Sequence, residues 1–348
     1  MKYTTEQNES QVPELPVEVK KMNGRKLDNK RVEGSFRRIG LRNYADRLGF
    51  CSSYLRFSIC DNGHKRLKDA NFCHVRLCPI CDWRRSEKQF AQIMEIMHVA
   101  YSKQPELRHI FLTLTCRNVS AEELEAELDK LFEGFRRLFM YKPVADVVKG
   151  WVRALEITYN EKDNTYHPHF HVLIAVEPDY FTGRSYIKQE VWCELWRRAM
   201  ELNYTPVVDV RVAKPGKRDV SEMAEAGKAE TTGDEVSSIV GVPSLGGVVA
   251  ELAKYTVKPS DILHVNDVIM DKVVSTLHAA LHHRRLVGFG GIYKKIKAEL
   301  ALPDIESDKA DLSDGPSLEC NCPICQAVVH TMFYRWNIGF KSYIFTSE

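Results

Sequence analysis

The chain has 348 residues, of which 44% are hydrophobic, so it is long enough for about two domains and for a core that needs no disulfide bonds. Its 49 Lys and Arg and 47 Asp and Glu residues leave a formal net charge of +2, which excludes a uniformly basic protein. Residues 1–10 lack the apolar core of a signal peptide, and no apolar run approaches the roughly 18 residues of a membrane helix. We therefore expect a soluble, cytoplasmic protein that does not bind a membrane.

Residues 1–40 are polar, contain proline and show little apolar periodicity, which predicts a flexible basic tail. Between Lys20 and Arg47 the sequence has ten basic and three acidic residues, whereas residues 300–319 have one basic and six acidic residues. This asymmetry favours a polyanion bound at one face. A solvated basic tail would explain the same charges.

Residues 41–88 form a predicted Cys-rich module. Cys78 and Cys81 have the spacing of a zinc knuckle. Cys73 and Cys51 would complete a set of four ligands for a structural Zn²⁺, and Cys60 is the alternative to Cys51. In a reducing compartment such clusters indicate metal sites rather than disulfides, and free buried thiols are the competing interpretation.

Four residues around the knuckle offer cations and an aromatic surface to DNA: Arg76, Trp83, Arg84 and Arg85. Packing of the module against the next domain would use the same side chains.

Residues 89–300 alternate between helix and strand patterns without the Gly-rich turn of a nucleotide-binding fold. Strands are expected at 109–115, 151–159, 169–176 and 207–212, and helices at 90–99, after the capping box at 120–123, at 187–202 and at 248–257. The pattern predicts an α+β fold, an antiparallel sheet of about five strands with helices mainly on one face. Residues 214–247 read as an exposed insertion within this domain.

Residues 301–348 are expected to be an acidic linker followed by a Cys-containing segment. A second zinc set is predicted there from Cys320, Cys322, Cys325 and His330.

The run His169-Phe170-His171 lies in a predicted strand, where residues two apart share a face, so both imidazoles can reach one ion while Phe170 points into the core. A hairpin through residues 160–164 would place Glu156 opposite His169. Two histidines and a carboxylate suit Mn²⁺ or Mg²⁺ used as a Lewis acid. His167 competes with Glu156 as the third ligand.

Downstream, helical spacing predicts that one helix presents Glu251, Tyr255 and Lys258 together on a single narrow face. An amphipathic helix with a half-buried tyrosine gives the same pattern. Tyrosine becomes a nucleophile only beside a cation or metal, because its pKa is near 10.

Three motifs in this order resemble those of rolling-circle plasmid replication initiators of the HUH endonuclease class: Phe111-Leu112-Thr113-Leu114-Thr115, His169-Phe170-His171 and Glu251-x-x-x-Tyr255-x-x-Lys258. The chain is most similar to the group with a single catalytic tyrosine and a nearby glutamate. The resemblance covers about residues 41–300 and includes segments 76–86 and 284–291. It implies that the domain at 89–300 is an HUH palm and that Arg284 and Arg285 contact DNA.

The resemblance also implies a mechanism. The metal polarises a phosphate of the origin, and Tyr255 attacks it, giving a 5′-phosphotyrosyl enzyme and a 3′-OH primer. Glu251 activates water or positions the second transfer at termination, and Lys258 pairs with a phosphate or the phenolate. The implied partners are double-stranded and extruded single-stranded origin DNA, a host helicase and a DNA polymerase. An HUH transposase, a mobilisation relaxase and a non-enzymatic zinc-finger regulator are the alternatives.

Overall fold

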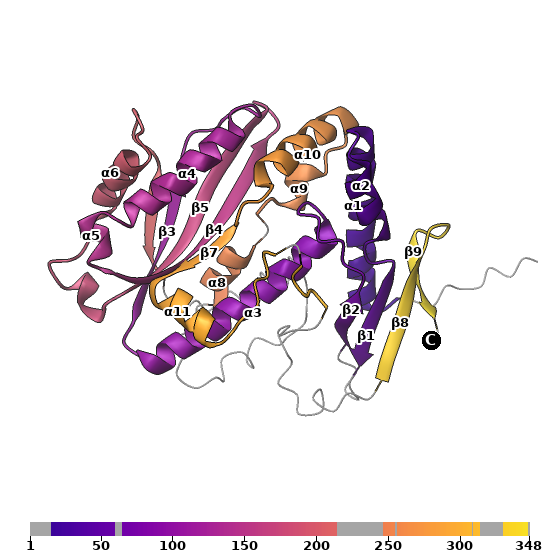
Figure 1. The fold of residues 1–348 in the computed structure, drawn as a ribbon, viewed down its shortest axis with the longest axis horizontal. Helices are drawn as coiled ribbons and strands as arrows, with labels where there is room; N and C mark the ends of the chain where they lie inside the picture. Colours follow the sequence, from indigo (N-terminus) through magenta and orange to yellow (C-terminus); the bar gives the residue numbers. More distant parts are fainter. Residues whose placement is uncertain are drawn as a thin grey trace, which may run out of the picture.

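The computed structural model describes residues 15–59, 65–213, 246–254, 256–307, 309–313 and 330–346. The fold is α+β and contains two antiparallel sheets (Figure 1). The larger sheet has five strands in the order β6-β3-β5-β4-β7, which confirms the expected strand number. Its strands are β3 (Arg108–Thr115), β4 (Val148–Asn160), β5 (Thr165–Val176), β6 (Val208–Val212) and β7 (Val287–Gly290).

The smaller sheet joins the two ends of the chain. Its order is β2-β1-β8-β9, formed by β1 (Tyr54–Ile59), β2 (Lys65–Ala70), β8 (His330–Asn337) and β9 (Ser342–Thr346). The C-terminal segment, expected to be a separate unit after an acidic linker, therefore completes the Cys-rich module. Its buried Tyr334 and Tyr343 supply apolar surface that β1 and β2 alone would lack.

Most of the expected flexible tail is instead helical. Helix α1 (Val17–Arg38) and helix α2 (Arg42–Phe50) pack together beside the small sheet (Figure 1). The buried face of α1 has helical spacing, but it includes Lys26 and Asn29 among its apolar residues. These two polar residues interrupt the apolar periodicity, which explains why the helix does not stand out in the sequence.

Helices cover both faces of the five-stranded sheet, whereas the sequence suggested mainly one face. One core contains α4 (Leu124–Leu138), α6 (Gln189–Ala199) and α10 (Asp267–Leu281). The core on the opposite face contains α3 (Pro79–Lys103), α8 (Gly246–Ala253) and α11 (Gly291–Glu299). Short helical turns are α5 (Lys142–Ala145), η1 (Pro178–Phe181) and α9 (Pro259–Ile262). None of the helices in the described ranges is long and apolar enough to cross a membrane.

Candidate active site and cysteine cluster

Glu156 on β4 and two histidines on β5 form one compact group. The register pairs Glu156 with His169, as the hairpin argument predicted. The Nε2 atom of His171 lies 3.0 Å from the Glu156 Oε2 atom, and that of His169 lies 3.7 Å from it. Phe170, between the histidines, is fully buried on the opposite face. The potential ligand atoms of the three residues lie within 4.8 Å of one another, an arrangement that could hold a metal ion.

Outer contacts orient both imidazoles toward this group. The Nδ1 atom of His169 lies 3.2 Å from the carbonyl oxygen of His167, and the Nδ1 atom of His171 lies 3.3 Å from the Thr113 hydroxyl. The Phe111 ring stacks on the His171 ring, with centroids 5.4 Å apart. Nδ1 contacts of this kind leave Nε2 for a metal. The motif on β3 therefore has a physical role, orienting His171, that the sequence alone did not reveal.

Lys258 and Glu251 approach the same group from outside the sheet. The Lys258 ammonium is 2.9 Å from Glu156 Oε1, and Glu251 Oε1 is 3.7 Å from His171 Nε2. Burial would raise the pKa of the Glu156 carboxyl, but hydrogen bonds with His169, His171 and Lys258 outweigh burial and hold the pKa well below its usual range. Glu156 is therefore a carboxylate, ready to ligate a cation.

Within the described residues, Glu251 and Lys258 do not share the continuous helix that was expected to carry them. Helix α8 ends at Ala253, and Lys258 precedes α9 in an extended conformation, with φ −65° and ψ 143°. Extended geometry is favoured before a proline, here Pro259. Tyr255 lies outside the described residues.

His167, the alternative third ligand, is not part of this group. Its ring packs 5.2 Å from the His169 ring, and burial lowers its pKa. Its polar contact with His169 is made by its carbonyl oxygen.

Cys51, Cys73, Cys78 and Cys81 form a second, buried group. The sulfur of Cys51 lies 3.6 Å from those of Cys78 and Cys81, and the Cys73 and Cys81 sulfurs are 3.7 Å apart. Four sulfurs at about 2.3 Å from a tetrahedral Zn²⁺ would be about 3.8 Å apart, so the cluster fits a structural zinc site.

The other cysteines of the zinc predictions are Cys60, Cys320, Cys322 and Cys325, and all lie outside the described residues. His330 begins β8 and is exposed.

Two polar residues of α1 lie beside this cluster. The fully buried Lys26 ammonium donates hydrogen bonds to the carbonyls of Gly49 and Cys51, and the Cys78 sulfur lies 3.2 Å from the Asn29 side-chain oxygen. Burial lowers the pKa of Lys26, while Cys51 acts in the opposite direction. If the four sulfurs ligated Zn²⁺ as thiolates, a Lys26 ammonium beside them would offset part of their negative charge. Lys26 and Asn29 were missed in the sequence because their neighbours are distant along the chain.

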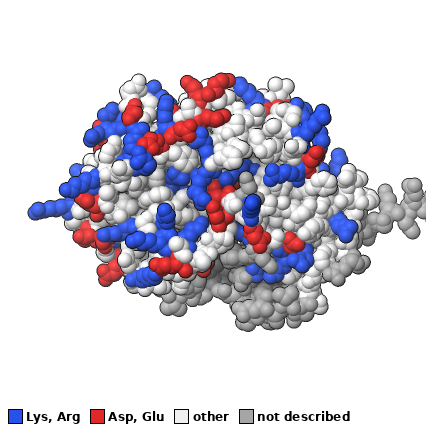
Figure 2. All heavy atoms as spheres, viewed as in Figure 1, with Lys and Arg blue, Asp and Glu red and all other residues white. Residues whose placement is uncertain are grey.

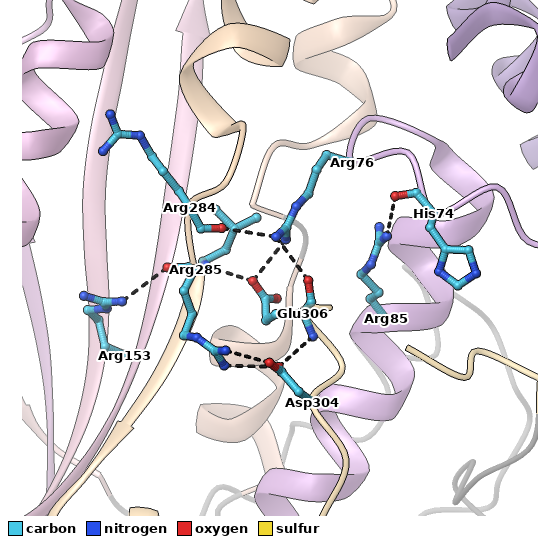
Figure 3. A network of polar contacts seen from close by, with 9 residues as sticks. His74, Arg76, Arg85, Arg153, Arg284, Arg285, Asp304 and Glu306 are labelled. Carbon is cyan, nitrogen blue, oxygen red and sulfur yellow. Dashed lines mark hydrogen bonds and ion pairs between the residues drawn. The ribbon is translucent and has the colours of Figure 1, made fainter. Parts of the chain in front are cut away.

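Three of the arginines expected to contact DNA join a network between the module and the larger sheet (Figure 3). Arg76 donates to Glu306 Oε2 at 3.1 Å and to the carbonyl of Arg284 at 3.1 Å. Arg285 pairs with Asp304 at 2.6 Å. These contacts connect the segment before α3, the segment before β7 and the segment after α11.

The other expected DNA contacts favour the packing alternative. Arg84 and Arg85 are only 2% and 5% exposed, and they donate to the carbonyls of Leu312 and His74 respectively. The Trp83 ring is covered by the guanidinium of Arg25, 4.5 Å from its centroid. Figure 2 shows basic and acidic side chains interspersed over the visible face.

Comparison with known proteins identifies close relatives. A family model described as "Replication protein" (Rep_1) matches residues 64–344, a range that ends in β9. "Protein rep" of Bacillus amyloliquefaciens is 40% identical over 314 residues, which cover 88% of this chain and 87% of the relative. "Protein rep" of Streptococcus pneumoniae is 36% identical over 287 residues, covering 82% and 81%. "Protein rep" of Lactiplantibacillus plantarum is 35% identical over 322 residues, covering 92% and 93%. No solved structure matches the chain.

Proposed function

The chain belongs to the Rep_1 family of replication proteins, and from this premise we propose that it initiates rolling-circle replication of a plasmid by nicking and rejoining origin DNA. We further propose that the five-stranded sheet is an HUH endonuclease palm. The observation that carries the proposal is the convergence of Glu156, His169 and His171 on one point, with Lys258 and Glu251 beside it.

Glu156, His169 and His171 would hold a divalent metal, since two imidazoles and a carboxylate with open positions suit Mn²⁺ or Mg²⁺. Bound there, the metal supplies Lewis-acid polarisation of the scissile phosphate. Thr113 and the His167 carbonyl keep both Nε2 atoms directed at the ion. Lys258 places a positive charge beside Glu156, where it would stabilise a phosphate oxygen or a developing phenolate.

Tyr255 is the proposed nucleophile. Its oxygen bonds to phosphorus as the bond from phosphorus to the 3′ oxygen breaks. The phenol gives up its proton, and the departing 3′ oxygen gains one, which leaves a 3′-OH primer. The flanking chain supports this role, because the carbonyl of Thr256 accepts a hydrogen bond of 2.8 Å from the Ile157 N–H, next to Glu156.

Glu251 is the proposed general base for termination. Its carboxylate sits near His171, two residues before the end of α8, where a carboxylate could take a proton from water. Lys254 also pairs with Glu251. If Glu251 had only a surface role, Glu251→Ala would leave both adduct formation and termination unchanged.

The buried cysteine cluster is the proposed structural zinc site of the module. We propose that the protein acts in the cytoplasm on double-stranded and extruded single-stranded origin DNA, with a host helicase and DNA polymerase extending the primer.

The deciding experiment is covalent trapping on a labelled origin oligonucleotide with Mn²⁺. We expect Tyr255→Phe to abolish the covalent adduct while origin binding persists, and Tyr186→Phe, which changes a half-exposed tyrosine, to behave as wild type. An undiminished adduct in Tyr255→Phe would overturn the assignment of the nucleophile. Binding without any adduct by the wild type would instead identify a regulator, and cleavage restricted to the ends of a mobile element would identify a transposase.

A further inference from the structure

The small sheet has one face in the core and one face outward. Leu55, Phe57, Tyr334 and Tyr343 are buried on the inner face. Because side chains alternate along a strand, the residues between them lie on the outer face. The described residues of this outer face include Tyr54, Arg56, Phe333, Arg335 and Ile344.

The strand register sets arginines beside rings on this face. Tyr54 of β1 pairs with Arg335 of β8, which pairs with Ile344 of β9, and Arg56 pairs with Phe333 in the adjacent row. Directly opposed side chains are about 5 Å apart at Cβ. Each arginine therefore has an aromatic neighbour, and the four side chains of Tyr54, Arg56, Phe333 and Arg335 form what we call the outer platform.

The charges of the outer platform are only partly neutralised. Arg56 and Arg335 are both exposed. Arg335 makes no ion pair with the described part of the chain, and Arg56 lies 3.7 Å from Asp69, the one acidic residue among the described positions of this face. Phe333 has no aromatic partner within the described residues and is half-buried.

Rings and guanidinium groups on a flat sheet match the chemistry of a single nucleic-acid strand. Unpaired bases stack on aromatic side chains, and arginines hold the phosphates between them. A duplex offers the same phosphates, but its bases are already stacked inside, so Tyr54 and Phe333 would gain little from it. The arrangement therefore favours single-stranded over double-stranded DNA.

We propose that the outer platform binds single-stranded DNA, separately from the group around Glu156 on the larger sheet. The inference rests on the proposed function only in its choice of DNA as the polyanion. The platform would hold the strand that becomes unpaired when an origin opens, while Phe333 and Tyr54 stack on its bases.

The test is fluorescence anisotropy of the full-length protein with labelled oligodeoxythymidine of about 20 nucleotides, longer than one such site needs. We expect Phe333→Ala to weaken binding roughly 5- to 100-fold without changing its salt dependence, because stacking is uncharged. Arg335→Ala should weaken binding and lower the slope of log affinity against log salt by about 0.7, the value for one phosphate contact on a single strand. Phe333→Leu keeps a large apolar side chain but removes the aromatic ring, and it should reproduce the loss seen with alanine.

Matched controls lie elsewhere on the surface. Phe50→Ala removes a 72% exposed ring from α2, and Arg136→Ala removes an exposed arginine from α4, so both should bind as wild type. Unchanged affinity in Phe333→Leu and Arg335→Ala, or equal losses on a duplex of the same length, would overturn the proposal. A wild type that forms no covalent adduct, but loses single-strand binding on Phe333→Leu, would refute the proposed function and leave this inference standing.

Discussion

Glu306 is expected to contribute more to stability than any exposed ion pair around it. Its side chain is 10% exposed, and its Oε2 atom accepts hydrogen bonds from Arg76 at 3.1 Å and from the backbone N–H of Leu286 at 2.8 Å. Arg76 belongs to the Cys-rich module and Leu286 precedes β7, so one carboxylate joins the two parts of the molecule (Figure 3).

The expected cost of Glu306→Ala follows from these contacts. Breaking a buried ion pair costs about 3–5 kcal/mol, because the remaining charge loses its partner. Arg76 keeps hydrogen bonds to two backbone carbonyls, so the lower end, about 3 kcal/mol, is appropriate. Glu306→Gln keeps an oxygen for the Leu286 N–H and should cost about half as much. Asp304→Ala is the matched control, since its pair with Arg285 is exposed and should be worth no more than about 1 kcal/mol.

Urea unfolding at constant Zn²⁺ measures these differences. We expect the loss in free energy of unfolding to be smallest for Asp304→Ala, larger for Glu306→Gln and largest for Glu306→Ala. The double variant that combines Arg76→Ala with Glu306→Ala should lose less stability than the sum of the two single variants. Equal costs for alanine at positions 304 and 306 would refute the argument that burial decides the strength of these pairs.

Three further predictions concern single side chains. Glu251→Ala should form the adduct with Tyr255 at a near wild-type rate but release it slowly, which adduct yield over time on a two-origin substrate measures; equal loss of both steps would contradict a termination role. Glu156→Gln should lower Mn²⁺ affinity at least about 10-fold in calorimetry, because a carboxylate ligand becomes a neutral amide; unchanged affinity would exclude it as a ligand. Burial lowers the pKa of His109 to about 4, below the ordinary value of about 6.5. As the pH drops from 6.5 to 4, the unfolded chain therefore binds a proton at His109 before the folded chain does, and the stability of the folded state falls. His109→Gln should remove up to about 3 kcal/mol of this pH dependence in unfolding measured at each pH, and an identical pH profile would contradict it.

The Glu156, His169 and His171 group could be predicted from the sequence because its geometry is local. The two histidines need only the two-residue period of a strand, and the loop from 160 to 164 is short enough to fix the hairpin register. The partners of the two histidine Nδ1 atoms were harder to predict from the sequence. Thr113 reaches His171 across a strand pair separated by more than 50 residues.

The approach of Glu251 and Lys258 could not be predicted by extending a helix. The helical wheel placed both on one face, but Pro259 excludes the helical conformation for Lys258. The two side chains instead reach the group by separate routes, Glu251 from α8 and Lys258 from the chain before α9. The sequence contained the relevant signal, since proline already marked the end of the helical pattern.

The small sheet shows a second reason why sequence-based prediction failed, the pairing of strands that are distant along the chain. β1 pairs with β8, which is more than 270 residues away, and no local pattern specifies such a partner. β8 and β9 each contribute one buried tyrosine, Tyr334 and Tyr343, yet the acidic composition before them suggested a linker. Likewise α1 has its buried residues at helical spacing, but Lys26 and Asn29 face the cysteine cluster rather than a purely apolar core.

Helix α3 connects the two predicted metal groups physically. Cys78 is its N-cap residue and Cys81 lies in its first turn, while Ile93 farther along packs in the same core as Leu252 of α8, the neighbour of Glu251. The Ser86 hydroxyl donates to the carbonyl of Ala253, at the end of α8. A zinc ion that fixes the start of α3 would therefore also fix the surface against which α8 rests. Because interiors are close-packed and transmit small shifts, we expect zinc binding at the cysteine cluster to affect the position of Glu251 as well as the stability of its own module.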